Sequence, residues 1–248
     1  MHLIVSIIIQ RDLFGDEVYN ITSSIEGLAQ CNDDGGFHRN KTDVANDILF
    51  QNVSHTGMYD IPLLDRCDYR RNVMPSAISF SKALSSRKQT GGILHFFEDD
   101  YKFARIFKNP MRYLVLLKRH MYVVMPDFSL LIGMARALQI YNVYRNYLLA
   151  NWMQRNGVRV VPLACWSDAS SFDWCFSGLP SGGTIAVSMA GAMGSELSKL
   201  AFWRGLKELF ARKTPDMVWL FGLHHNAEVE EYIASTCDVE FINTNYHG

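Results

Sequence analysis

Short apolar runs alternate with helical segments through the middle of the chain, and the runs end in acidic residues. The runs cover residues 92–97, 122–125 and 158–163, and the acidic residues that follow them are Glu98-Asp99-Asp100, Asp127 and Asp168. Buried strands that alternate with helices form mainly parallel sheets. Polar groups at the C-terminal ends of such strands are where α/β proteins keep their sites. The sequence therefore predicts an α/β fold with a site at one edge of its sheet.

Eight candidate strands follow residue 60, at residues 61–64, 76–80, 93–97, 122–125, 158–163, 184–188, 217–221 and 239–242. Eight strands allow a (β/α)8-like barrel, while the short first units would equally give a distorted or open sheet. Residues 59–248 are expected to form this α/β domain. Residues 1–58 contain turn-forming polar stretches such as Asn32-Asp-Asp-Gly-Gly36, so we expect an irregular N-terminal extension that packs on the main domain.

Composition narrows the functional classes. The chain has 248 residues, of which 48% are hydrophobic, so it can bury a full core. A net charge of -1 disfavours a broad, non-specific nucleic-acid surface but leaves room for a local basic patch. Basic pairs such as Lys118-Arg119 are more typical of solvated helix ends.

Cysteine usage and the N-terminus indicate a cytoplasmic protein. The five cysteines are scattered and include no Cys-x-x-Cys pair, so neither a zinc ribbon nor a thioredoxin-type pair is predicted. The apolar stretch of residues 1–9 is far shorter than the roughly 18 residues needed to span a bilayer. We expect it to be a β-strand and expect no membrane association.

The acidic triplet Glu98-Asp99-Asp100 is the sharpest motif. Adjacent carboxylates repel one another, so such a group costs stability unless a cation, an arginine or a proton relieves it. Asp99 or Asp100 would be a nucleophile, a general acid or base, or a metal ligand. The structural alternative is that one of them caps the helix that follows.

Asp127 follows the next strand, in the sequence Met125-Pro-Asp-Phe-Ser129. It would be a base or second metal ligand, or else a cap for a helix that begins at about residue 130. Neighbouring parallel strands lie about 5 Å apart, so carboxylates at both ends could share one ion, water or substrate. If a metal is used, Glu98, Asp100 and Asp127 would hold Mg²⁺ or Mn²⁺, because carboxylate-only sites suit these ions rather than zinc.

Other residues could complete a substrate site at the same edge. The candidates are Asn142 and Arg145 on a long helix over residues 130–156, Trp166 and Asp168 after the third strand, Gly191 before a later helix, and His224 after a later strand. Arg145 would pair with Asp127 or with a substrate phosphate. The alternatives are an exposed polar helix face for Asn142 and Arg145, an ordinary polar loop for Asp168 and an incidental loop histidine for His224.

Several motifs, in order, resemble a family of bacterial and phage proteins known as a domain of unknown function. They include residues 96–103 (Phe-Phe-Glu-Asp-Asp-Tyr-Lys-Phe), 126–129 (Pro-Asp-Phe-Ser), 139–146 (Gln-Ile-Tyr-Asn-Val-Tyr-Arg-Asn) and 176–180 (Phe-Ser-Gly-Leu-Pro). The resemblance covers roughly residues 60–241. It implies a bacterial, plasmid or phage origin and brings no activity with it.

A fainter, architectural resemblance is to the tRNA-guanine transglycosylases and their phage DNA-modifying relatives. In those proteins, aspartates at the ends of barrel strands act as nucleophile and base while a nucleobase is exchanged. The zinc-binding cysteine cluster of that family is absent from this chain. The resemblance therefore rests on architecture and residue type.

The leading hypothesis is an enzyme of a phage or mobile element that acts on a nucleotide or nucleic acid. Asp99, Asp100 and Asp127 would carry out base exchange, N-glycosidic cleavage or phosphoester chemistry. The alternative is a non-catalytic subunit that binds a nucleic acid, a nucleotide or a protein partner. It would use stacking by exposed aromatic side chains at Trp166, Phe172, Trp174 and Phe176.

Overall fold

The computed structural model describes residues 8–11, 17–20, 47–69, 76–86 and 92–244. The chain divides into two compact units, residues 1–42 and 43–248. In the first unit, β1 (Ile8–Arg11) pairs antiparallel with β2 (Glu17–Asn20). Residues 1–7 of the expected first strand and the turn at residues 32–36 lie outside the described residues. An extension of residues 1–58 that packs on residues 59–248 stays a prediction.

The second unit starts with the 3-10 helix η1 (Asp47–Leu49) and an antiparallel hairpin of β3 (His55–Thr56) and β4 (Ile61–Pro62). The strands after this hairpin are β5 (Ala77–Ser79), β6 (Ile93–His95), β7 (Tyr122–Val124), β8 (Val160–Val161), β9 (Leu163–Ala164), β10 (Thr184–Ser188), β11 (Met217–Gly222) and β12 (Asp238–Asn243). The helices between them are α2 (Phe80–Ser85), α3 (Asp100–Phe103), α4 (Arg105–Lys108), η2 (Pro110–Tyr113), α5 (Leu114–Lys118), α6 (Arg136–Arg155), η3 (Ala169–Ser171), α7 (Phe172–Cys175), α8 (Glu196–Lys213) and α9 (Ala227–Ala234).

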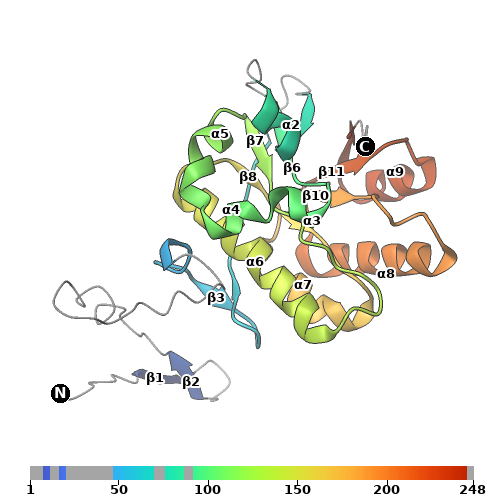
Figure 1. The fold of residues 1–248 in the computed structure, drawn as a ribbon. Helices are drawn as coiled ribbons and strands as arrows, with labels where there is room; N and C mark the ends of the chain where they lie inside the picture. The colour runs from blue at the N-terminus through green and yellow to red at the C-terminus, as the bar shows by residue number, and fades with distance from the viewer. Residues whose placement is uncertain (1–7, 12–16, 21–46, 70–75, 87–91, 245–248) are drawn as a thin grey trace, which may run out of the picture. The chain divides into compact units, whose positions relative to one another are not determined.

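The strands after the hairpin form two four-stranded parallel sheets, with the orders β5-β6-β7-β8 and β9-β10-β11-β12. Each strand lies next to its neighbour in sequence, as expected when one helical crossover follows another. Figure 1 shows the strands in the centre of this unit, with helices α4, α5, α6, α8 and α9 around them. The predicted α/β class with a mainly parallel sheet is confirmed.

A proline separates the two sheets. β8 ends at Val161, β9 begins at Leu163, and Pro162 between them has no N–H with which to continue a ladder. Its carbonyl oxygen still accepts a hydrogen bond from the N–H of Ala186 at 2.8 Å. One extended segment, residues 160–164, therefore belongs to the first sheet at one end and to the second sheet at the other.

Aromatic rings pack the two sheets against each other. The ring of Trp219 on β11 lies 5.3 Å from the ring of Tyr122 on β7. Phe221, two residues further along β11, lies 4.9 Å from Phe97. Because β11 and β7 belong to different sheets, these contacts show that the two sheets curve toward each other over a shared core.

The eight parallel strands are not the eight segments predicted from the sequence. Ile61, expected in the first strand of the parallel sheet, lies in β4 and pairs antiparallel with Thr56 of β3. Among the described residues, no pairing joins β5 to β12, so the parallel strands do not close into a barrel there. This part of the prediction is not confirmed, and the parallel sheets are open as described.

Local chemistry fixes the ends of α8. The hydroxyl of Ser195 accepts a hydrogen bond from the N–H of Ser198, which is the usual role of serine at the start of a helix. Glu196 lies in the first turn and Lys213 in the last, as the helix dipole favours. Among the described helices, none combines the length and the apolar character that crossing a lipid bilayer requires.

Candidate functional site

Asp100 reaches from the end of β6 to the loop after β7. Its carboxylate accepts hydrogen bonds from the backbone N–H of Ser129 at 3.1 Å and from the Ser129 hydroxyl at 2.8 Å. Arg145 lies 3.6 Å away through Nη2. The side chain of Asp100 does not cap α3, although it is the first residue of that helix. The capping alternative is therefore wrong for Asp100, whose side chain instead joins two strand ends and α6.

Asp127 is the second carboxyl at this position. Burial, and to a lesser extent the negative charge of Asp100, raises the pKa of the Asp127 carboxyl from 3.8 to about 7. The residue keeps some solvent-accessible surface even though protein atoms surround its carboxyl closely. It makes no hydrogen bond or ion pair to another described residue. α6 begins only at Arg136, so Asp127 cannot cap it, and that alternative is also wrong.

The loop that carries Asp127 is held by two asparagines of α6. Asn146 is fully buried; its amide oxygen accepts from the N–H of Phe128 at 2.8 Å and its amide nitrogen donates to the Phe128 carbonyl at 3.3 Å. Asn142 donates to the carbonyl of Ser129 at 2.7 Å. The two residues that follow Asp127 are thus anchored through their backbone, which fixes the loop on the C-terminal side of Asp127.

Arg145 is held flat on an aromatic ring. Its guanidinium lies 3.4 Å from the centre of the Phe128 ring and 5.1 Å from that of Tyr141. Its side chain is 17% exposed and the side chain of Asp100 is 32% exposed. A half-buried, stacked guanidinium beside a carboxylate is well oriented for a bound anion or a charged substrate. The predicted partner of Arg145 was Asp127; the structure pairs it with Asp100.

Cys165, after β9, lies near enough to Asp127 to feel its charge. Burial raises the pKa of the Cys165 thiol well above its usual range, and the charges of Cys175 and Asp127 act in the same direction. The side chain of Asn146 bonds to this thiol. A thiol with a raised pKa is a poor nucleophile. Cys165 therefore forms part of the wall of the site. The four described cysteines are all free thiols.

Two buried polar atoms at this site have no hydrogen-bond partner among the described residues. They are the amide oxygen of Asn142 and Nε of Arg145. The residues lie three apart on α6, so their side chains share one face of the helix. Buried polar atoms are nearly always paired with protein, water or ligand. The site therefore presents one free acceptor and one free donor beside its two carboxyls.

Glu98 and Asp99 point elsewhere. The carboxylate of Glu98 accepts hydrogen bonds from the N–H and the hydroxyl of Ser81, at the start of α2. Asp99 is exposed and pairs with Lys102 at 3.2 Å. In the described part of the chain, no group of three His, Cys, Asp or Glu side chains is placed to hold a metal ion. The three-carboxylate set of Glu98, Asp100 and Asp127 is therefore not assembled.

Trp166 and Asp168 have structural partners. The indole N–H of Trp166 donates to the carbonyl of Ala201 on α8 at 3.0 Å. Asp168 caps η3 by accepting from the N–H of Ser170 at 2.8 Å. The rings of Phe172, Trp174 and Phe176 are buried, so the expected exposed stacking surface is wrong for these three side chains.

Gly191 and His224 lie in exposed loops after β10 and β11. Gly191 has a φ of 71°, which favours glycine in a tight turn. No hydrogen bond or ion pair joins either residue to Asp100 or Asp127 in the described part of the chain, and their roles in substrate binding stay predictions.

Sequence reasoning did not single out Ser129, Cys165 or His95. His95 ends β6 and is 1% exposed; burial, and to a lesser extent the charge of Lys82, lowers its pKa to about 3. Its Nδ1 accepts from the N–H of Phe97 at 3.2 Å, so the proton of the neutral ring sits on Nε2, which has no partner among the described residues. The sequence pattern that points to His95 is a single histidine within a short apolar strand.

Comparison with known sequences now gives a family. A family described as "Domain of unknown function (DUF4417)" matches residues 53–241. The chain belongs to the DUF4417 family. This match contains the motifs at residues 96–103, 126–129, 139–146 and 176–180, so the expected membership of an uncharacterised family is confirmed.

Relatives of this DUF4417 chain come from phages. It is 35% identical over 198 residues to the "Gene 1 protein" of Mycobacterium phage L5, which covers 77% of this chain and 85% of that protein. It is 40% identical over 133 residues to the "Gene 1 protein" of Mycobacterium phage D29, covering 54% of this chain and 49% of that protein. The second match thus spans about half of that relative. No solved structure matches the chain.

Proposed function

We propose that this DUF4417 protein is an enzyme that breaks or exchanges the N-glycosidic bond of a nucleotide, free or within a nucleic acid. Asp127 would act as general acid and Asp100 as the ionised carboxylate that faces the sugar. One observation carries the proposal: two neighbouring carboxyls sit in unlike surroundings. Asp100 is held by Ser129 and Arg145, while Asp127 has no hydrogen-bond partner among the described residues.

Because their surroundings differ, one of two carboxyls can stay protonated and donate a proton while the other is ionised at the same pH. A carboxyl whose pKa lies near the working pH can donate a proton and take it back within one turnover. The protonated Asp127 would donate its proton to the nucleobase nitrogen as the bond from that nitrogen to C1′ breaks. Asp100 would stabilise the positive charge that develops on the sugar. Water, or a second nucleobase in an exchange reaction, would then add to C1′ and return a proton to Asp127.

Substrate contacts would come from α6. The unpaired oxygen of Asn142 suits an N–H or hydroxyl donor, and Nε of Arg145 suits an acceptor such as a phosphate oxygen. Metal-assisted phosphoester chemistry is less well supported, because the carboxylates expected to bind Mg²⁺ or Mn²⁺ do not come together in the described residues.

The wider setting is part of the same proposal. The phage relatives support a protein of a phage or mobile element that works in the cytoplasm of the bacterial host. The consecutive order of the parallel strands supports an open, distorted barrel, with the site at the C-terminal ends of β6, β7 and β9. Carboxyl sites at this end are common in barrel enzymes.

The test measures release of free nucleobase from nucleosides, nucleotides and short oligonucleotides by chromatography. Asp127→Asn removes the proton donor and should lower the rate by about 100-fold or more. Asp173→Asn is the matched control, because Asp173 is exposed and pairs with Arg212 at 3.1 Å, away from the site. Equal rates for the two variants would overturn the assignment. Binding of these ligands without any base release would favour the non-catalytic alternative.

A further inference from the structure

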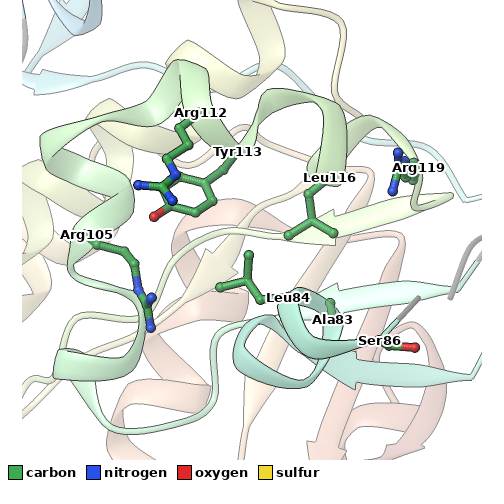
Figure 2. A pocket seen from close by; sticks show the side chains of 8 residues that line it. All are labelled: Ala83, Leu84, Ser86, Arg105, Arg112, Tyr113, Leu116 and Arg119. Atoms are coloured by element: carbon green, nitrogen blue, oxygen red, sulfur yellow. The ribbon is translucent and has the colours of Figure 1, made fainter. Parts of the chain in front are cut away.

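A second site lies on the outside of the α/β unit, in a groove of about 280 Å³ between α2 and the segment from α4 to α5. Figure 2 shows this groove, with Leu84 of α2 and Leu116 of α5 pointing into it from opposite sides. Arg105 and Arg112 lie toward one end and Arg119 toward the other. It shares no lining residue with the carboxyl site.

The groove is strongly basic. Its three arginines recur every seven residues along the chain, and no carboxylate is among its lining residues. Arg112 and Arg119 are exposed and make no hydrogen bond or ion pair with another residue that the structure describes. Arg105 uses Nε and Nη2 to bond the carbonyl of Lys102, which leaves Nη1 toward solvent.

Three other arginines of this unit are paired with carboxylates. Arg212 forms an ion pair with Glu208 at 2.6 Å, and Arg66 forms one with Asp216 at 2.7 Å. Arg145 lies 3.6 Å from the carboxylate of Asp100. Guanidinium groups gathered without a counter-charge repel one another and gain stability when an anion binds. In a chain of net charge -1, this concentration of positive charge is local and is not a consequence of overall composition.

The arrangement favours an extended anion over a compact one. The guanidinium groups are spread from one end of the groove to the other, so a single phosphate cannot contact all of them (Figure 2). The floor between them is apolar, with Leu84 39% exposed and Leu116 half-buried. A strand of nucleic acid carries successive phosphates and apolar sugar and base faces along one line. A duplex is instead read by an element that protrudes into its groove.

We propose that this groove binds the phosphodiester backbone of a single-stranded nucleic acid through Arg105, Arg112 and Arg119. The ring of Tyr113 in the groove is buried, so binding depends on phosphate contacts more than on base stacking, and it tolerates different sequences. The groove goes beyond the proposed chemistry at Asp127, and neither site requires the other to be correct.

The test is fluorescence anisotropy of the full chain with labelled DNA and RNA strands of about 20 nucleotides, across about 50 to 200 mM salt. The double variant Arg112→Gln/Arg119→Gln should weaken binding by about tenfold or more. It should also reduce the slope of log affinity against log salt by about 1.4, since each phosphate contact on a single strand contributes about 0.7.

Arg204→Gln/Lys207→Gln is the matched control, because both residues are exposed on α8 and the loss of charge is the same. It should bind as wild type does. Arg112→Lys/Arg119→Lys keeps the charge and should stay within a few-fold of wild type, which separates lost contacts from a folding defect.

Several results would overturn the proposal. They are no binding by the wild-type protein, equal loss in the control variant, and tighter binding of a duplex of the same length. A fourth is displacement of the strand by inorganic phosphate or a mononucleotide at the same phosphate concentration, which would assign the groove to a compact phosphate ligand. Base release from free nucleosides should be unchanged in Arg112→Gln/Arg119→Gln, so failure of the groove proposal is distinguishable from failure of the proposed chemistry.

Discussion

Ser129 donates two hydrogen bonds to Asp100, one from its backbone N–H at 3.1 Å and one from its hydroxyl at 2.8 Å. The two residues follow neighbouring strands, β6 and β7, so this contact ties two strand ends together. Asp127 lies two residues before Ser129 in the same loop. The separation of the two carboxyls is therefore set by backbone contacts, which is the rigidity that a general acid and its partner carboxylate require.

The pH dependence of base release is the first prediction. Asp127 must be protonated to act as general acid, and burial together with the charge of Asp100 raises its pKa to about 7. The rate should hold at lower pH and fall about tenfold per unit above the pKa. A profile of kcat/KM, which reports pKa values of the free enzyme, between about pH 5 and about pH 9 measures this. The decline should be absent from the residual activity of Asp127→Asn; a rate that rises with pH would contradict the role.

Stability of Asp127→Asn should depend on pH in the opposite sense from an ordinary salt-bridged aspartate. Because the pKa of Asp127 in the folded protein lies above its unfolded value of 3.8, ionising it opposes folding. This cost is absent at pH below 3.8 and grows until the pH passes about 7. The variant removes the cost, so its free energy of unfolding relative to wild type should rise over that window, by at most on the order of 4 kcal/mol.

Urea denaturation of both proteins at about pH 5 and about pH 8 measures the difference. Asp173→Asn again serves as the control, since Asp173 is exposed. A gap between Asp127→Asn and wild type that is the same at both pH values would show that Asp127 titrates normally in the folded chain.

Strand positions were predictable because they depend on local sequence. The runs that became β6, β7, β10 and β11 are apolar, short and followed by turns or helices, and each was placed within a few residues. Ile61 was assigned to the parallel sheet in error. Its strand is two residues long, and nothing in so short a run shows that its partner is Thr56.

The long helix shows what sequence patterns miss. A helix was expected from about residue 130, whereas α6 begins at Arg136. Asn142 and Asn146 bind backbone groups of Phe128 and Ser129 that a helix would use for itself. Such side-chain bonds compete with the helix, and they depend on tertiary contacts. The same loop brings Asp127 near Asp100. The nearness of carboxyls from two strand ends was therefore predictable, while the partners of each carboxyl were not.

Glu98 gives the next prediction, because the structure assigns it to α2 rather than to a metal. Its carboxylate receives the N–H of Ser81 at 2.9 Å and also the Ser81 hydroxyl, at the positive end of that helix. Glu98→Ala should lower the free energy of unfolding by about 1.5 to 3 kcal/mol, the usual cost of losing hydrogen bonds to a charged group. Urea denaturation measures it.

Glu98→Gln keeps an acceptor oxygen and should retain most of that stability. It should also retain base release, since Glu98 lies outside the carboxyl pair. Loss of activity in Glu98→Gln with an unchanged denaturation midpoint would instead restore Glu98 as a ligand or catalytic group.

Gly205 gives the last prediction, through its contact with Trp166. It lies inside α8, where alanine would ordinarily stabilise the helix by about 1 kcal/mol over glycine. A Cβ at Gly205 would overlap the indole of Trp166, whose N–H bonds the carbonyl of Ala201. Overpacking costs about 1 to 3 kcal/mol and the lost hydrogen bond about 1 kcal/mol. Together, the overpacking and the lost hydrogen bond cost more than alanine gains as a helix former. Gly205→Ala should therefore destabilise the protein.

A double-mutant cycle with Trp166→Leu isolates this contact. Removing the indole leaves room for the methyl group, so Gly205→Ala in the Trp166→Leu background should be neutral or stabilising by up to about 1 kcal/mol. Thermal denaturation of the four proteins measures the coupling. Equal destabilisation in both backgrounds would mean that the methyl group collides with something other than Trp166. A large coupling would establish that Trp166 serves to dock α8 on the strand end at residue 164, and it would remove Trp166 from the residues that contact substrate.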